Sequence, residues 1–335
     1  MLSQSDRLGN RGGHWMDLVA RDPVPWLLDP VNPSVRFQTL RDIFRQSAEQ
    51  LENEHARILA WRPVAQLRRH WDPYHFWGRA HDPYYGGPVG NFGSLYLLTQ
   101  LAAPRFPEVE QPCEDLWVYG RHEDGIFSPP GEAAAPWLSY TGMALQILLH
   151  FGYGDHPEVE NAWLAAARRI EADPRRLGCL LDDRICRAGA VKMLGALLHR
   201  PAADPNAPGR DFGQIDSAVG LICDYLLPHA YDWEGEDAEW MLPRFPRYYD
   251  TDIVEFSHVM SHTVKGYTIS NRSASASKRI LQQMLTLQDQ SGRWTKLKTT
   301  PALAEEHVYQ PSRWLTFEAV HALILAHGDA MYASG

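Results

Sequence analysis

The sequence predicts an all-α fold in which the helices are arranged in pairs. Apolar residues recur at helical spacing in about a dozen segments, each bounded by Pro, Gly or Asp. No convincing run alternates between apolar and polar residues as a half-buried strand would. Short connections join the helices into pairs and longer loops separate the pairs, which is typical of stacked α-hairpins. A row of such hairpins either stays open as a solenoid or closes into a ring.

The first helix is predicted to follow Asn32-Pro33-Ser34, because Pro33 suits a first helical turn and the apolar residues after it share one face. Two connections, 72–90 and 125–136, are rich in aromatic residues, Gly and Pro, and are predicted to be long loops. The predicted helices span residues 35–44, 48–61, 64–70, 92–103, 108–119, 137–151, 157–171, 188–199, 214–227, 251–262, 274–287 and 314–327.

The domain organisation is predicted to be simple. Residues 1–22 are expected to form a polar N-terminal extension, and residues 23–330 a single helical domain. The segment from Pro201 to Gly209 is the best candidate for a break, and we expect it to join two helices of that one domain. Four cysteines are too few for a disulfide scaffold in 335 residues and indicate reduced thiols.

Charge and hydropathy exclude several classes of partner. A net charge of −9 disfavours nucleic acids and anionic membrane surfaces, which attract clustered Lys and Arg. No stretch of 18 apolar residues could span a bilayer, and the polar segment from Met1 to Met16 does not look like a signal peptide. We therefore expect a cytoplasmic protein without a transmembrane segment, and leave open whether it forms a homo-oligomer.

A short motif near the C-terminus connects the predicted hairpins to a known fold. Gln288-Asp-Gln-Ser-Gly292-Arg-Trp294 follows a helix. The Gln amide can cap the helix end, Gly allows the turn that follows, and Trp can pack across the hairpin with its N–H on a backbone carbonyl. Written as Q-x3-G-x-W, the segment resembles the QW repeat of squalene–hopene cyclases and their toroidal relatives.

Further blocks extend this resemblance over about residues 23 to 325. They are Pro25 to Asp42, Cys186 to Lys192, Phe245 to Glu255, and Pro311 to Thr316. The chain resembles a bacterial prenyltransferase- or squalene-cyclase-like family of the terpenoid-cyclase and protein-prenyltransferase superfamily. The resemblance implies a single (α/α)6 toroid, in which six helix pairs close into a ring. Since one fold hosts many functions, the fold alone implies no activity.

The resemblance points to Asp250-Thr-Asp252-Ile-Val-Glu255 as the catalytic segment. Class II terpene cyclases protonate an alkene or epoxide with the middle Asp of a D-x-D-D motif, which requires a carboxyl group kept protonated by its surroundings. Asp250 and Asp252 match the first two acids, the third position is Ile253, and Glu255 on the same helical face can supply the missing carboxylate. Asp252 can equally be a helix N-cap, with Glu255 completing a capping box.

Two cysteines form a second candidate site. Cys179 and Cys186 flank Asp182 and Asp183, and a toroidal terpene hydro-lyase places cysteines and an Asp in its cavity in a comparable way. The alternative is that Cys186 is a small buried residue at a helix start. We predict no metal site and no cofactor, because no ligand spacing typical of zinc is present. His258 and His262 share a helical face, but the sequence shows no partner for them.

Aromatic and basic residues complete the candidates. In a toroid, loops and inner helix ends line the central cavity, where aromatic rings bind apolar chains and stabilise carbocations. The basic residues Lys192, Arg244, Arg247, Arg313, Lys296 and Lys298 could hold a diphosphate, although solvated surface charge is the expected role of most. Residues expected to contact substrate are Trp137, Tyr140, Cys179, Tyr248, Tyr249, Trp294 and Trp314.

The family resemblance, together with these residues, implies a terpenoid-cyclase-like enzyme that cyclises or isomerises a small isoprenoid or other apolar substrate by acid initiation in a central cavity. The predicted catalytic residues are Asp252, Asp250, Glu255 and Cys186. A toroidal hydro-lyase or isomerase using cysteine and carboxylate side chains is one alternative. A non-catalytic protein that binds hydrophobic ligands or acts as a scaffold is the other.

Overall fold

The computed structural model describes residues 14–73, 77, 90–128, 138–172, 187–199, 213–226, 235–298 and 306–328. Within these ranges the regular structure is helical, and the only β-type pairings are isolated bridges. The α-helices are α2 (Val24–Leu27), α3 (Pro33–Gln38), α4 (Ala48–Ala60), α5 (Arg62–Arg69), α6 (Asn91–Gln100), α7 (Pro107–Tyr119), α8 (Leu138–His150), α9 (Pro157–Ala172), α10 (Arg187–Leu198), α11 (Gly213–Leu226), α12 (Ile253–Gly266), α13 (Asn271–Leu285) and α14 (Arg313–His327). The all-α prediction is confirmed.

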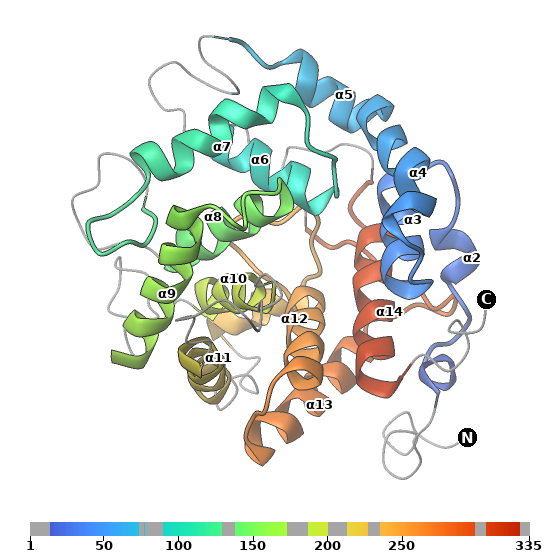
Figure 1. Cartoon of the computed structure of the whole chain (residues 1–335). Helices are drawn as coiled ribbons and strands as arrows, with labels where there is room; N and C mark the ends of the chain where they lie inside the picture. Colours follow the sequence, from blue (N-terminus) through green and yellow to red (C-terminus); the bar gives the residue numbers. More distant parts are fainter. Residues whose placement is uncertain are drawn as a thin grey trace.

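The helices form a ring of antiparallel pairs (Figure 1). Helices α6, α8, α10, α12 and α14 follow one another around the inside, and α14 packs back onto α2 and α3. Helices α7, α9, α11 and α13 lie outside their partners, and α4 lies outside α3. The hairpins predicted from the sequence therefore close into a toroid.

Burial separates the inner helices from the outer ones. Eight consecutive residues of α6, from Asn91 to Leu98, are buried, since α6 is covered on all sides. The outer helix α4 buries only Leu51 and Ile58. A helix that is apolar all round requires partners on every face, whereas an amphipathic helix requires a partner on one face. The sequence of each helix thus specifies its place in the ring.

The first described residues belong to the same packed unit. Trp15, in a 3₁₀ turn (η1, Trp15–Asp17), is fully buried. The side chain of Gln288 accepts from the backbone N–H of Ala20 at 2.8 Å and donates to the carbonyl of Leu18 at 3.1 Å. Residues 14–22, which the sequence assigns to an extension, are thereby attached to the hairpin of α13.

The Gln288–Trp294 segment has the geometry predicted for it. Trp294 is fully buried, and its Nε1–H donates to the carbonyl of Met284 at 2.9 Å. Gly292 has φ +71°, and a Cβ there would lie 2.0 Å from the carbonyl oxygen of Arg21. Only glycine suits this turn, because both the left-handed backbone and the close approach exclude a side chain. The segment joins the C-terminal end of α13 to residues 18–21.

Within the described ranges, each helix is too short or too polar to cross a membrane.

Candidate active site

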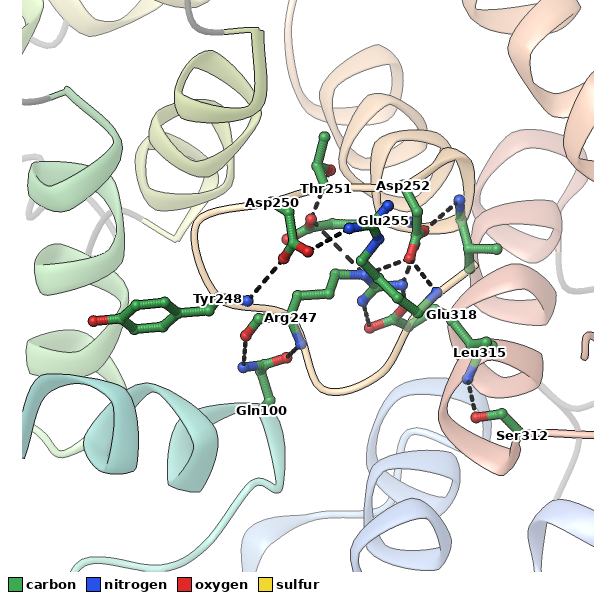
Figure 2. Close-up of polar contacts among 12 residues, drawn as sticks. Gln100, Arg247, Tyr248, Asp250, Thr251, Asp252, Glu255, Ser312, Leu315 and Glu318 are labelled. Atoms are coloured by element: carbon green, nitrogen blue, oxygen red, sulfur yellow. Dashed lines mark hydrogen bonds and ion pairs between the residues drawn. The ribbon is translucent and has the colours of Figure 1, made fainter. Parts of the chain in front are cut away.

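The candidate site is a buried group of charged side chains centred on Arg247 (Figure 2). Arg247 lies in the segment that precedes α12, and Gln100 at the end of α6 anchors its backbone at 2.9 Å and 2.8 Å. Its guanidinium donates to both oxygens of Asp252, at 2.9 Å and 3.1 Å, and to Glu318 on α14 at 2.8 Å. Through its backbone and its side chain together, Arg247 thus connects α6, α12 and α14.

Asp252 is the N-cap of α12 and has no exposed surface. Besides Arg247, its carboxylate accepts from the backbone N–H groups of Arg244, Val254 and Glu255, at 2.8, 2.8 and 3.0 Å. All five of these contacts are with N–H donors, and the carboxylate is the acceptor in each. The capping role predicted as an alternative is present, and helix α12 therefore begins at residue 253, not 251.

Glu255 lies one turn into α12 and is held by a buried lysine. Both of its oxygens lie close to the Lys192 ammonium, at 2.6 Å and 2.8 Å, and the Thr251 hydroxyl donates to one of them at 2.7 Å. Lys192 comes from α10 and is fully buried. An unpaired buried ammonium would be costly, and Glu255 satisfies it. Glu255 does not close a capping box, since its side chain faces Lys192 and Thr251.

Asp250 lies at the edge of the group, with 42% of its side chain exposed. It accepts from the guanidinium of Arg244 and from the backbone N–H of Tyr248. Although burial opposes the charge on Asp250, Arg244 holds the pKa of this carboxyl below its ordinary value. Asp250 and Asp252 therefore pair with the guanidinium groups of different arginines.

The core of the group carries excess negative charge. Lys192 and Arg247 supply two cations, whereas Asp252, Glu255 and Glu318 supply three carboxylates, a balance of −1. Burial raises the pKa of Glu318, and the neighbouring carboxylates raise it further against the attraction of Arg247. The structure therefore shifts the Glu318 carboxyl group toward its protonated form.

Sequence reasoning missed Glu318. A usable signal was present, because Glu318 is the only acidic residue of the otherwise largely apolar segment 313–327. A lone acid on a helix that is buried on most sides requires a buried partner or a proton. The solvated role expected for the basic residues is wrong for Lys192, Arg244, Arg247 and Lys296, which are buried.

An aromatic group lies beside the charged one. Phe92 stacks on Tyr140 with ring centroids 4.1 Å apart, and Tyr249 and the edge of Tyr248 lie 6.4 Å and 6.2 Å from the same ring. Tyr140 is fully buried, and burial raises the pKa of its hydroxyl. That hydroxyl has no hydrogen-bond partner in the described part of the chain. Three of the predicted substrate contacts are thus brought together.

The other predicted contacts lie apart from this group or outside the described ranges. Trp294 packs within the hairpin of α13. Trp314 is buried, stacks on Phe245 with ring centroids 4.4 Å apart, and donates from Nε1–H to the Ser34 hydroxyl at 3.4 Å. Trp137, Cys179 and Cys186 fall outside the described residues.

Three histidines form a possible metal-ligand group, of which the sequence analysis identified two. His258 and His262 on α12 meet His321 of α14, and the ligand atoms of the three histidines all lie within 4.8 Å of one another. Local spacing did not show this group, because His321 is 63 residues beyond His258.

No protein-family model and no curated protein sequence matches the chain. Two solved structures of a type II terpene cyclase, MstE from Scytonema, are similar to it, one with a bound substrate, geranylgeranyl dihydroxybenzoate, and one with a product, merosterolic acid A. Each is 13% identical and covers 84% of this chain and 99% of its own, with TM-scores of 0.30 and 0.28. At this identity and these TM-scores, the likeness assigns neither a family nor an activity to the chain.

Proposed function

We propose that the protein is an enzyme that cyclises or isomerises an apolar, isoprenoid-like substrate by acid initiation, with the Glu318 carboxyl group as the proton donor. The observation that carries this proposal is the buried group of two cations and three carboxylates beside an aromatic group. A proton on Glu318 makes that group neutral. An acid that is poised in this way can protonate a carbon–carbon double bond.

The proposed reaction is redox-neutral. The Glu318 O–H proton adds to one carbon of an alkene, and the resulting carbocation is attacked by the π electrons of a second alkene, which forms a carbon–carbon bond. The final carbocation loses a proton from a neighbouring carbon, and a proton returns to the Glu318 carboxylate. Substrate and product are isomers, so the proposal requires no cofactor.

The other carboxylates have supporting roles in this proposal. Asp252 positions Arg247 and caps α12, since donors surround its carboxylate. Glu255, 14% exposed, adds negative charge near Glu318 that keeps the proton bound. Asp250 fixes the Tyr248 backbone and Arg244. The acid-initiated chemistry expected from the sequence is retained, and the donor is reassigned from Asp252 to Glu318.

The aromatic group is proposed as the substrate surface. The faces of Phe92, Tyr140, Tyr248 and Tyr249 would stabilise a developing carbocation by cation–π attraction. The Tyr140 hydroxyl, which lacks a partner among the described residues, offers a hydrogen bond to a polar substrate terminus. Such a pocket would favour a chain that is mostly apolar with one polar end.

The test is an activity screen with matched glutamate variants. Purified protein is incubated with linear isoprenoids of increasing length, and products are detected by gas chromatography with mass spectrometry. Glu318→Gln is expected to abolish product formation while substrate affinity is kept, and Glu318→Asp to retain part of the rate. The control is Glu108→Gln on α7, which also removes a partly exposed glutamate paired with an arginine.

Three outcomes separate the candidate functions. Product formed equally by wild type and Glu318→Gln overturns the assignment of the acid. Loss of product in Cys186→Ser, with Glu318→Gln fully active, supports the hydro-lyase alternative. Isoprenoids that bind without any conversion identify a ligand-binding protein.

A further inference from the structure

Three histidines from two inner helices meet at one point of the ring. His258 and His262 are four residues apart on α12, so their side chains lie one above the other on the same face. His321 comes from α14, which packs against α12. The Nε2 of His258 lies 3.0 Å from the Nδ1 of His321, and the ring centroids of His262 lie 4.8 Å from His258 and 5.1 Å from His321.

The surroundings of the three histidines favour the neutral imidazole, which is the form that binds metals. Burial lowers the pKa of His262 to about 3 and that of His321 to about 4, and that of His258 lies well below its ordinary range for the same reason. Neutral imidazoles each offer a lone pair, which an imidazolium lacks. His321 is buried and His258 and His262 are partly buried, so the group brings polar ring atoms into a largely apolar region.

We propose that His258, His262 and His321 form a binding site for a divalent transition metal ion of the Zn²⁺ class. Imidazole nitrogens suit Zn²⁺ and its neighbours Co²⁺, Ni²⁺ and Cu²⁺, whereas Mg²⁺ and Ca²⁺ prefer oxygen ligands. Three histidines leave a fourth position open for water or another ligand, as in zinc sites that take part in catalysis.

The observed geometry is close to what such an ion requires. Ligands of a tetrahedral Zn²⁺ at about 2.0–2.1 Å from the ion lie about 3.3 Å from one another. The three ligand atoms here already lie within 4.8 Å of one another, so side-chain rotations of modest size would close the site. Phe317 packs beside His321, with centroids 5.7 Å apart, and limits the space available for other positions of that ring.

The surroundings also set a limit on affinity. His199 lies near the group, with its centroid 6.4 Å from that of His262. Arg41, Arg45 and Lys265 act on His321 with positive charge, and Asp42 acts with negative charge. The net positive charge of these four side chains repels a metal cation. The affinity must therefore come from the bonds between the ion and the three imidazoles. Metal binding here does not depend on any acid role of Glu318.

The test is metal binding to the full chain, produced without a histidine tag and stripped with a chelator. Co²⁺ alone is titrated and followed by its visible d–d absorption, which is intense for tetrahedral sites. Zn²⁺ alone is then bound and counted by elemental mass spectrometry. We expect one ion per chain, a tetrahedral Co²⁺ spectrum, and a higher thermal midpoint with Zn²⁺.

Variants locate the ion. His258→Gln, His262→Gln and His321→Gln are each expected to weaken Zn²⁺ affinity by more than the about 10–100-fold that loss of a ligand's hydrogen-bond partner costs. His150→Gln, a matched change of a histidine on α8 outside the group, is expected to bind as wild type. The midpoint shift with Zn²⁺ is measured on each folded variant, with circular dichroism as the check of folding.

Two results overturn the proposal. One is wild-type protein that shows no tetrahedral Co²⁺ spectrum and no retained Zn²⁺. The other is stoichiometric binding that all three variants leave unchanged, which would place the ion elsewhere on the chain.

Discussion

Arg247 and Asp252 form a two-pronged ion pair that is buried on both sides. Nε lies 2.9 Å from Oδ2 and Nη2 lies 3.1 Å from Oδ1, and the side chains are 3% and 0% exposed. The pair holds the segment before α12 in a tight loop that directs Arg247 toward α14. Loss of either partner leaves a buried charge uncompensated.

Arg247→Met is therefore expected to lower the free energy of unfolding by about 3–5 kcal/mol, because Asp252 and Glu318 lose their shared cation. Arg247→Lys keeps the charge without the planar fork and is expected to cost less. Chemical denaturation measures both. Arg57→Met, whose side chain is 54% exposed, is the control and should cost about 1 kcal/mol or less. Equal costs at positions 247 and 57 would contradict the central role of Arg247.

Replacement of Asp250 and of Asp252 should lower the free energy of unfolding by very different amounts. Asp252→Asn replaces an acceptor with an amide group facing N–H donors, and we expect a cost of about 3–5 kcal/mol. Asp250→Asn changes a half-exposed carboxylate and should cost about 1 kcal/mol. Thermal and urea unfolding of the two variants give the comparison. A tolerated Asp252→Asn that loses only activity would return the acid role to Asp252.

Gly292→Ala should detach residues 14–22 from the turn that follows α13. The left-handed backbone costs about 1–2 kcal/mol, and the new Cβ cannot occupy a position 2.0 Å from the Arg21 carbonyl oxygen. We expect faster proteolysis within residues 14–22 and a lower thermal midpoint. Gly220→Ala on α11 is the matched control, since a Cβ there meets nothing within 4 Å, and it should stabilise by about 0.5–1 kcal/mol. Unchanged proteolysis in Gly292→Ala would show that the contact is dispensable.

His150 should make stability depend on pH. Burial lowers its pKa to about 4 from 6.5, and Nε2 lies 2.7 Å from the Ala103 carbonyl. Above pH 6.5 both folded and unfolded states hold it neutral, so nothing is lost. Between 6.5 and 4 only the unfolded state takes up the proton, and stability falls as pH falls.

We expect this contribution to reach about 3 kcal/mol near pH 4. The measurement is urea unfolding of wild type and His150→Gln at about pH 7.5 and at pH 4. The difference between the two proteins should shift by that amount in favour of the variant as pH falls. A constant difference would mean that His150 titrates at its ordinary pKa in the folded protein.

The sequence predicted most helices well, because the spacing of apolar residues within one helix depends only on residues that are close together in the chain. The predicted segment 157–171 corresponds to α9, and 48–61 to α4, within about one residue. The start of α12 was placed two residues early, since the sequence does not distinguish an N-cap from a first helical residue. The short helix α2 was not predicted, because four residues are too few for a periodic signal.

The site was harder to predict because its partners are far apart in sequence. The segment around Asp252 was found, but Glu318 and His321 come from α14, and only ring closure brings them to α12. Pairing also decided the character of the basic residues. From the sequence alone, Lys192 and Arg247 were expected to be surface charges. The structure shows that both are buried and paired with carboxylates.

The attachment of Gln288 to Leu18 and Ala20 joins residues 270 and 268 positions apart. Neighbouring hairpins can assemble from contacts that are close in sequence, whereas the contact of Gln288 with Leu18 and Ala20 forms only when the first and last helices of the ring come together. Contacts of such sequence separation slow folding, because chain entropy is lost before they form. During synthesis, the faces of α2 and α3 that contact α14 stay uncovered until α14 has been made. Ring closure is therefore expected to be the last step of folding and the step most exposed to aggregation.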